Sequence, residues 1–166
     1  MTGEKKIGDI VIDGLVQDLF SGTWVPIRDY RTLPDCKYPG VYLLAYTDEN
    51  LIGQQVRTQD IYYVGVTQSC GGVRQRLYQF LCGLEKPVAH SAAMRFLSEV
   101  AAGTPYSQLA EKRQFFVTSV SVECQPRKTL RTPVDLQKCG IVAALEWYAL
   151  ARVKEETGGE PFLNKK

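Results

Sequence analysis

The chain has 166 residues, of which 45% are hydrophobic and 23% are charged, and its formal net charge is +2. This length accommodates one domain with insertions, and no apolar run approaches the roughly 18 residues that a membrane span requires. The two N-terminal lysines are soon followed by Asp9 and Asp13, which interrupt the apolar core that a secretion signal needs. We therefore expect a cytoplasmic protein that does not contact a membrane.

Cysteine usage and charge distribution narrow the class further. The five cysteines are odd in number and contain no CxxC pair, which argues against a disulfide scaffold and a zinc site and predicts reduced, mostly buried thiols. The modest net charge hides a gradient along the chain. Residues 1–56 carry a net charge of −3, residues 57–131 carry +5, and the remainder is neutral. The net charge alone does not indicate a nucleic-acid binder, but the middle of the chain is its basic part.

The N-terminal part combines short apolar runs with turn signals. Residues 1–35 are interpreted as an extension that packs on the same domain as residues 36–166. Asp13-Gly14 lies between the runs IVI and LV, so we expect a hairpin turn there.

Three strands are predicted from β-rich or alternating runs. VYLLAY follows Pro39-Gly40 and predicts a strand over 40–47, and IYYVGVT predicts another over 61–67. Residues 48–60 between them are polar and turn-like, so the two strands are expected to be antiparallel neighbours joined by an inserted loop. Alternation of apolar and polar residues predicts a third strand over 115–124.

Helical periodicity predicts three helices in the remaining chain. They run from after Gly71-Gly72 to near Gly83, from about 89 to 102, and from about 136 to 156. Arg76 borders the apolar stripe of the first helix. Glu146 sits at the edge of the apolar face of the last helix, where a carboxylate at the rim of a buried surface suggests a function.

Five short motifs occur in order along these elements. They are GVY at 40–42, YVG at 63–65, VRQRL at 73–77, ALE at 144–146 and PFLN at 161–164. Together they resemble the ordered signature of the GIY-YIG nuclease superfamily, and the resemblance spans residues 40–164. It implies an α+β fold with a three-stranded antiparallel sheet flanked by helices, with the two tyrosines on adjacent strands.

The resemblance assigns catalytic roles to four side chains. Glu146 is expected to hold one Mg²⁺ or Mn²⁺ ion, because a single carboxylate with substrate phosphate and waters is a normal Mg²⁺ arrangement. Arg76 is expected to bind the scissile phosphate, with Arg74 as the alternative if the helix register differs. Tyr42 is expected to act as the general base or its relay, which requires a nearby cation to lower its pKa, and Tyr63 to orient the water or phosphate. The four catalytic side chains are expected to line one concave, basic cleft.

Other residues are expected to support this site. Asn164 is expected to fix the glutamate helix and the wall of the site by hydrogen bonds, and Gly40 and Gly65 are supporting residues of the two tripeptides. A basic loop within 125–135 adds three cations that could contact nucleic acid, namely Arg127, Lys128 and Arg131. Both a phosphate-tracking surface and simple solvated charge fit this loop, and its nearness to the predicted Glu146 helix favours the former.

The sequence departs from the family pattern at several points. The spacing between Tyr42 and Tyr63 is about twice the usual one, and the stretch from Glu146 to Asn164 is also longer, which loop insertions allow. Phe80 stands where the family often has a histidine or tyrosine. The single histidine, His90, is interpreted as an exposed helix-start residue rather than a catalyst.

Two functions follow as alternatives. The first is a metal-dependent endonuclease that hydrolyses DNA, of a restriction type or of a repair or mobile-element type, with RNA not excluded as a substrate. A single site must act twice to break both strands, which leaves a homodimer open. The second is a catalytically silent domain that keeps the fold and binds nucleic acid or protein.

Overall fold

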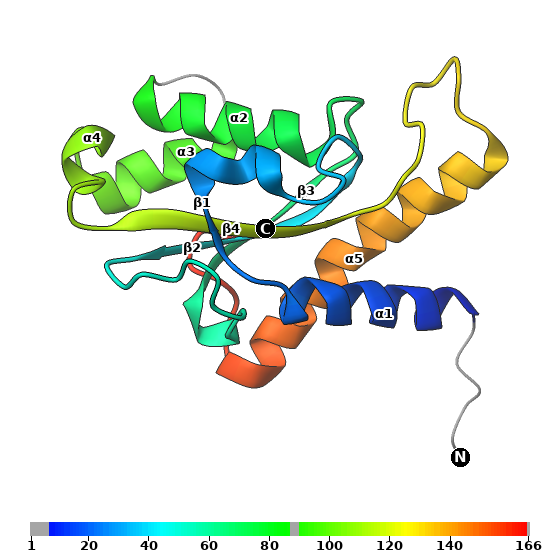
Figure 1. Ribbon diagram of the computed structural model, residues 1–166, viewed down its shortest axis with the longest axis horizontal. Helices are drawn as coiled ribbons and strands as arrows, with labels where there is room; N and C mark the ends of the chain where they lie inside the picture. Colours follow the sequence, from blue (N-terminus) through cyan, green and yellow to red (C-terminus); the bar gives the residue numbers. More distant parts are fainter. Residues whose placement is uncertain (1–6, 87–89, 166) are drawn as a thin grey trace.

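The computed structural model describes residues 7–86 and 90–165, and it has an α+β fold built on one antiparallel sheet. The described part contains four strands in the order β1-β4-β2-β3 (Figure 1). They are β1 (Val25–Pro26), β2 (Gly40–Thr47), β3 (Ile61–Thr67) and β4 (Gln114–Ser121). The predicted antiparallel pairing of β2 with β3 is confirmed. The prediction of three strands is wrong, because the short β1 pairs with the free side of β4.

Helices cover both faces of the sheet. In Figure 1, α2 (Gly72–Glu85) and α3 (Ser91–Phe96) lie on one side, and α1 (Ile7–Ser21) and α5 (Pro133–Thr157) lie on the other. The short segments are η1 (Ile27–Thr32), η2 (Thr58–Asp60), the π-helical η3 (Leu97–Ala101) and α4 (Tyr106–Leu109). None of the described helices is long and apolar enough to cross a membrane.

The apolar run of β2 is explained by its place between two cores. Successive strand side chains point to opposite faces, so Val41 and Leu43 pack with α1 and α5, whereas Tyr42 and Leu44 pack with α2 and α3. Because both faces are covered, nearly every position of β2 is buried. This explains why its sequence lacks the polar alternation of a half-exposed strand.

The predicted hairpin at Asp13-Gly14 is wrong, since these residues lie inside helix α1. The apolar residues Ile12, Val16 and Leu19 are buried at helical spacing against the sheet and α5. An Asp-Gly pair is a strong local turn signal, but here the packing of this apolar stripe outweighs it.

Several predicted element ends also move. The third strand ends at Ser121 rather than at 124. The last helix begins at Pro133, because Thr132 and Asp135 form a reciprocal capping box and proline fits the first helical position. The helix expected over 89–102 is divided into α3 and η3, and residue 89 lies outside the described residues.

The inserted loop is held against the N-terminal segment. Backbone hydrogen bonds join Trp24 N–H to the Gln54 carbonyl at 3.0 Å, Gly53 N–H to the Trp24 carbonyl at 2.9 Å and Val56 N–H to the Gly22 carbonyl at 3.1 Å. These contacts connect the chain between α1 and β1 with the 48–60 insertion. Together with the pairing of β1 and β4, they join the chain between α1 and η1 to the sheet.

All five cysteines are free, but the expectation that most are buried is wrong. Only Cys36 and Cys124 are buried, while Cys70 is exposed in the loop before α2. The Sγ atoms of Cys124 and Cys139 lie 3.9 Å apart, between the chain after β4 and helix α5.

Candidate active site

The two motif tyrosines lie side by side on the face of the sheet that α2 covers. The register of β2 and β3 pairs Tyr42 with Gly65 and Leu44 with Tyr63, which makes the tyrosines diagonal neighbours. Their ring centroids are 6.0 Å apart. A Cβ atom at Gly65 would collide with the Tyr42 ring, so this glycine makes room for the ring across the strand pair. Gly40 permits a similarly close approach of β2 to the Val120 carbonyl of β4.

Arg76 reaches the tyrosines from α2. Its charge lowers the pKa of both hydroxyl groups, but burial of the rings acts more strongly, and the net effect is a raised pKa for Tyr42 and for Tyr63. The Tyr42 side chain is completely buried, and its hydroxyl has no hydrogen-bond partner among the described residues. The cation expected beside Tyr42 is present, yet the phenol is protonated at neutral pH.

Glu146 enters the same region from the opposite helical layer. It lies on α5, it is buried, and it is not without an interaction partner. Its negative charge contributes to the raised pKa of Tyr63. Because α5 packs against β3, the outermost strand, a side chain from this layer can approach the tyrosines around the edge of the sheet.

His90 belongs to this cluster, so the expectation that it is exposed is wrong. The side chain is 1% exposed, and its Nδ1 accepts a hydrogen bond from Ala93 N–H at 3.4 Å, which caps the start of α3. Burial, together with the charges of Arg76 and Arg95, lowers the pKa of His90 to about 4. The buried Nε2 has no hydrogen-bond partner among the described residues. Capping of α3 turns the imidazole into the protein, a contact that helical periodicity does not reveal.

Arg95 is the second residue that the sequence did not indicate. It lies on α3, its charge lowers the pKa of both Tyr63 and His90, and its Nη1 donates a hydrogen bond to the Lys165 carbonyl at 3.3 Å. Its Nε is buried without a partner among the described residues. No motif marked Arg95, and its position became evident only from the packing of α3 against α2.

Phe80 packs against the imidazole ring of His90. The Phe80 side chain is completely buried, and its ring meets the His90 ring edge-on with the centroids 5.3 Å apart. The cluster therefore has an imidazole beside Phe80, supplied by a different helix.

Asn164 fastens the C-terminal segment to β3. Its Oδ1 accepts a hydrogen bond from Val64 N–H, and its Nδ2 donates one to the Val64 carbonyl, each at 2.8 Å. Leu163 N–H also donates to the Tyr62 carbonyl at 3.1 Å. The segment thus occupies the outer side of the edge strand that carries Tyr63.

The remaining predicted residues lie elsewhere. Arg74 is two positions from Arg76, which places it about 200° away around the helix, on the opposite flank of α2. The basic loop residues Arg127, Lys128 and Arg131 are exposed between β4 and α5, in a loop that projects beyond the sheet (Figure 1). Glu146 lies roughly 20 Å along α5 from the start of that helix, so the loop is not adjacent to this carboxylate.

The side chains expected to line one concave, basic cleft form a compact, mostly buried cluster together with His90 and Arg95. Its six members are Tyr42, Tyr63, Arg76, His90, Arg95 and Glu146, and we call them the tyrosine–arginine cluster. Of these, only Arg76 and Arg95 are partly exposed. Among the described residues, no three His, Cys, Asp or Glu side chains are grouped to hold a metal ion.

Comparisons of the chain with protein-family models, with curated proteins and with solved structures found no match.

Proposed function

We propose that this chain is a metal-dependent endonuclease of the GIY-YIG type that hydrolyses DNA phosphodiester bonds. The observation that carries the proposal is the meeting of side chains from β2, β3, α2, α5 and the start of α3 in one cluster. Three buried polar atoms of this cluster, the Tyr42 hydroxyl, His90 Nε2 and Arg95 Nε, have no partner among the described residues. Buried polar groups normally carry hydrogen bonds, so such a concentration favours a site for a polar ligand.

A phosphodiester fits the chemistry of this cluster. The guanidinium groups of Arg76 and Arg95 match phosphate oxygens and would neutralise the charge that grows in the transition state. Because Nδ1 of His90 accepts a hydrogen bond, the proton of the neutral imidazole resides on Nε2, which can donate to a phosphate or leaving-group oxygen. A bound anion would also raise the pKa of His90, which the two cations keep low.

Tyr42 is suited to pass on a proton rather than to act as a preformed phenolate. Burial raises its pKa, so the hydroxyl keeps its proton. It can take up a proton from a water molecule as it passes its own proton to a neighbouring group. Tyr63, at the same edge and closer to Glu146, is placed to orient the water or the phosphate.

Glu146 is the carboxylate of the cluster and would hold the metal ion. One carboxylate fits Mg²⁺, since this ion keeps several waters and binds through one or two protein carboxylates and substrate phosphates. When bound, the ion supplies a Lewis acid for the phosphate oxygens and lowers the pKa of a water molecule.

The test is cleavage of supercoiled plasmid and of branched DNA in Mg²⁺ or Mn²⁺ by the full chain. We expect Glu146→Gln to lower the rate by about 100-fold or more and Tyr42→Phe to lower it substantially, as for loss of groups that act in the transition state. Glu155→Gln, an exposed position on the same helix, is the matched control and should cleave like the wild type. Circular dichroism verifies that each variant is folded. Cleavage that persists in Glu146→Gln contradicts the site assignment.

The second candidate is a silent binding domain with the same fold, and the nearly complete burial of the cluster favours it. Under this alternative, no DNA is cut in either metal, but DNA binds with an affinity that falls steeply with salt. The cleavage assay and a binding titration on the same sample distinguish the two functions.

A further inference from the structure

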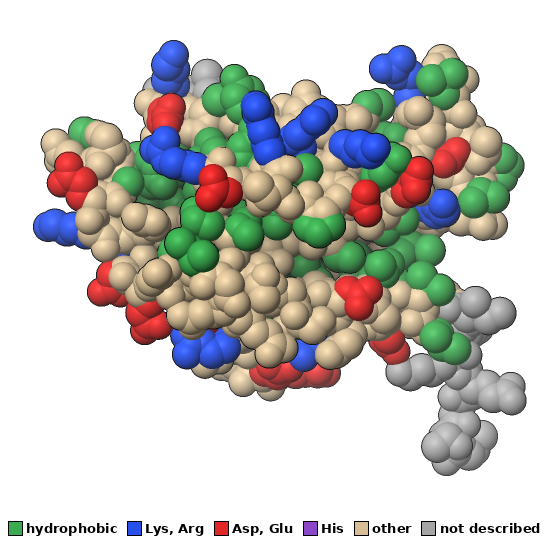
Figure 2. Space-filling view, viewed as in Figure 1, with side chains coloured by type: hydrophobic (Ala, Val, Ile, Leu, Met, Phe, Trp, Pro, Cys, Tyr) green, Lys and Arg blue, Asp and Glu red, His purple; other side chains and the backbone are tan. Residues whose placement is uncertain are grey.

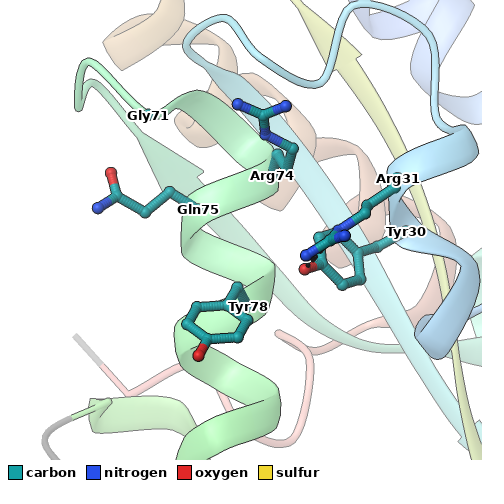
Figure 3. Close-up of a pocket in the computed structure, with 6 residues that line it drawn as sticks. All are labelled: Tyr30, Arg31, Gly71, Arg74, Gln75 and Tyr78. Carbon is teal, nitrogen blue, oxygen red and sulfur yellow. Dashed lines mark hydrogen bonds between the residues drawn. The ribbon is translucent and has the colours of Figure 1, made fainter.

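A separate groove lies between η1 and α2, and we call it the η1–α2 groove. Its volume is about 520 Å³, and it is lined by Tyr30, Arg31, Gly71, Arg74, Gln75 and Tyr78. Figure 3 shows Tyr30 and Arg31 on the η1 side and the other four residues along α2. The space-filling view shows Lys and Arg side chains gathered over these two elements (Figure 2). None of the six residues belongs to the tyrosine–arginine cluster.

The lining carries positive charge without a counter-charge. It contains two arginines and no Asp or Glu, and neither Arg31 nor Arg74 is ion-paired within residues 7–86 and 90–165. Arg31 is braced by its neighbour, since its Nε donates a hydrogen bond to the Tyr30 hydroxyl at 3.2 Å. Two guanidinium groups with free donors favour an anionic ligand, and phosphate oxygens match their geometry.

An exposed aromatic ring accompanies the charges. Tyr78 is 54% exposed, whereas Tyr30 is 5% exposed and belongs to the core. Tyr78 follows Arg74 by four residues, so the two side chains share one flank of the helix. A stacking ring beside phosphate-binding cations is the combination with which proteins hold unpaired nucleotides.

The groove is anchored by backbone hydrogen bonds and lies close to the proposed active site. Val73 N–H donates to the Tyr38 carbonyl at 3.0 Å and Arg74 N–H to the Cys36 carbonyl at 2.7 Å, which fastens the start of α2 to the chain after η1. Arg74 and Arg76 flank the same turn of α2 on opposite sides. A nucleic-acid strand that crosses this turn would meet both arginines.

We propose that the η1–α2 groove binds an unpaired nucleic-acid strand beside the cleavage site, with Arg31 and Arg74 on backbone phosphates and Tyr78 stacked on a base. This inference rests on the proposed function and adds to it a preference for DNA with a single-stranded flank. Arg74 thus acts on a flanking phosphate, while Arg76 acts on the scissile one.

The test measures fluorescence anisotropy of a labelled single-stranded oligonucleotide and of a blunt duplex of equal length, with Glu146→Gln as the background to prevent cleavage. We expect Arg74→Ala and Tyr78→Leu to raise the Kd for the single strand by about 10-fold, as for loss of one stacked base or phosphate contact. Tyr78→Phe keeps the ring and should stay within about twofold. The slope of log K against log salt should fall by about 0.7 for each arginine removed.

Two controls lie outside the groove. Tyr148→Leu removes an exposed tyrosine of α5, and Lys112→Ala removes an exposed cation before β4; both should leave the Kd unchanged. Unchanged single-strand binding in Arg74→Ala and Tyr78→Leu overturns the inference, and so does a wild-type chain that binds neither oligonucleotide. If groove variants weaken binding while the wild type cuts no DNA, the groove stands and the proposed nuclease fails. If the wild type cuts DNA and the groove variants bind normally, the proposed nuclease stands and the groove inference fails.

Discussion

At the scale of single residues, His90 differs most from what its sequence context indicated. A lone histidine before a helix is usually a solvated cap. Here the imidazole caps α3 and is buried beside Phe80 and two arginines. Its pKa of about 4 keeps the folded imidazole neutral at pH values where an unfolded one is protonated, which makes its protonation a direct probe of the cluster.

We predict that lowering the pH from 7 to 5 destabilises the protein through His90. The unfolded imidazole binds a proton below its ordinary pKa of 6.5, whereas the folded one does so only near pH 4. Stability contributed by neutral His90 is thus complete above pH 6.5 and is lost as the pH falls toward 4, by about 1 to 2 kcal/mol at pH 5. Urea unfolding at pH 7, 6 and 5 measures this loss.

His90→Asn is the control for this prediction, because asparagine retains a capping oxygen but does not titrate. The variant should lose part of the pH dependence of the wild type. Since the chain has one histidine, its imidazole NMR signal is unambiguous. A signal that titrates near pH 6.5 in the folded protein would contradict the prediction.

The sequence predicted the charged and aromatic members of the site that carry motifs, but not those placed by packing. Tyr42 and Tyr63 were proposed from the resemblance of GVY and YVG to family motifs, and the two apolar runs that carry these motifs predicted the adjacent strands on which the tyrosines lie. Arg95 was not predicted, because it lies on a six-residue helix followed by a π-helical segment. The regular α-helical spacing of apolar residues there is too short to form a pattern. Burial of His90 depends on the angle between α2 and α3, which no local pattern encodes.

At the scale of elements, the strand pair β2–β3 is the framework of the site. Tyr42 needs the space that Gly65 leaves on the neighbouring strand, and Asn164 holds the outer side of β3. These contacts make the tyrosine positions depend on strand pairing rather than on a loop.

We predict that Gly65→Ala lowers the free energy of unfolding by about 1 to 3 kcal/mol, because the added methyl overlaps the Tyr42 ring in a filled core. Gly140→Ala is the matched control. Gly140 lies within α5 with open space around it, so alanine there should stabilise the protein by about 0.5 to 1 kcal/mol. Urea unfolding of both variants measures the two effects, and equal stability of Gly65→Ala and wild type would contradict the first.

Strand identity could be predicted more completely than helix identity. Apolar runs bounded by turn residues gave β2 and β3 with correct ends, since these strands are buried on both faces. Helix α1 was missed because its Asp-Gly pair favours a turn locally, while its stabilising contacts with α5 are distant in sequence. The two-residue β1 has too little sequence to carry a pattern and is defined by its partner β4.

At the scale of the whole molecule, the site joins the two helical layers around one edge of the sheet. Arg76 and His90 come from the α2–α3 layer, and Glu146 comes from the α1–α5 layer. The cluster therefore requires both cores to be packed around β3. Each chain therefore has one tyrosine–arginine cluster in its described part. This number determines how many strands the proposed nuclease would cut in one encounter.

We predict that supercoiled plasmid is converted first to nicked circles and only later to linear DNA when the protein is limiting. If the chain is the proposed nuclease, one cluster would hold one scissile phosphate, so each binding event would break one strand and the second strand would require another encounter. An agarose-gel time course in Mg²⁺ measures the order of products, with Glu146→Gln as the inactive control. Linear DNA that appears at once, without nicked circles at any protein concentration, would contradict separate action and indicate two chains cutting together as a homodimer.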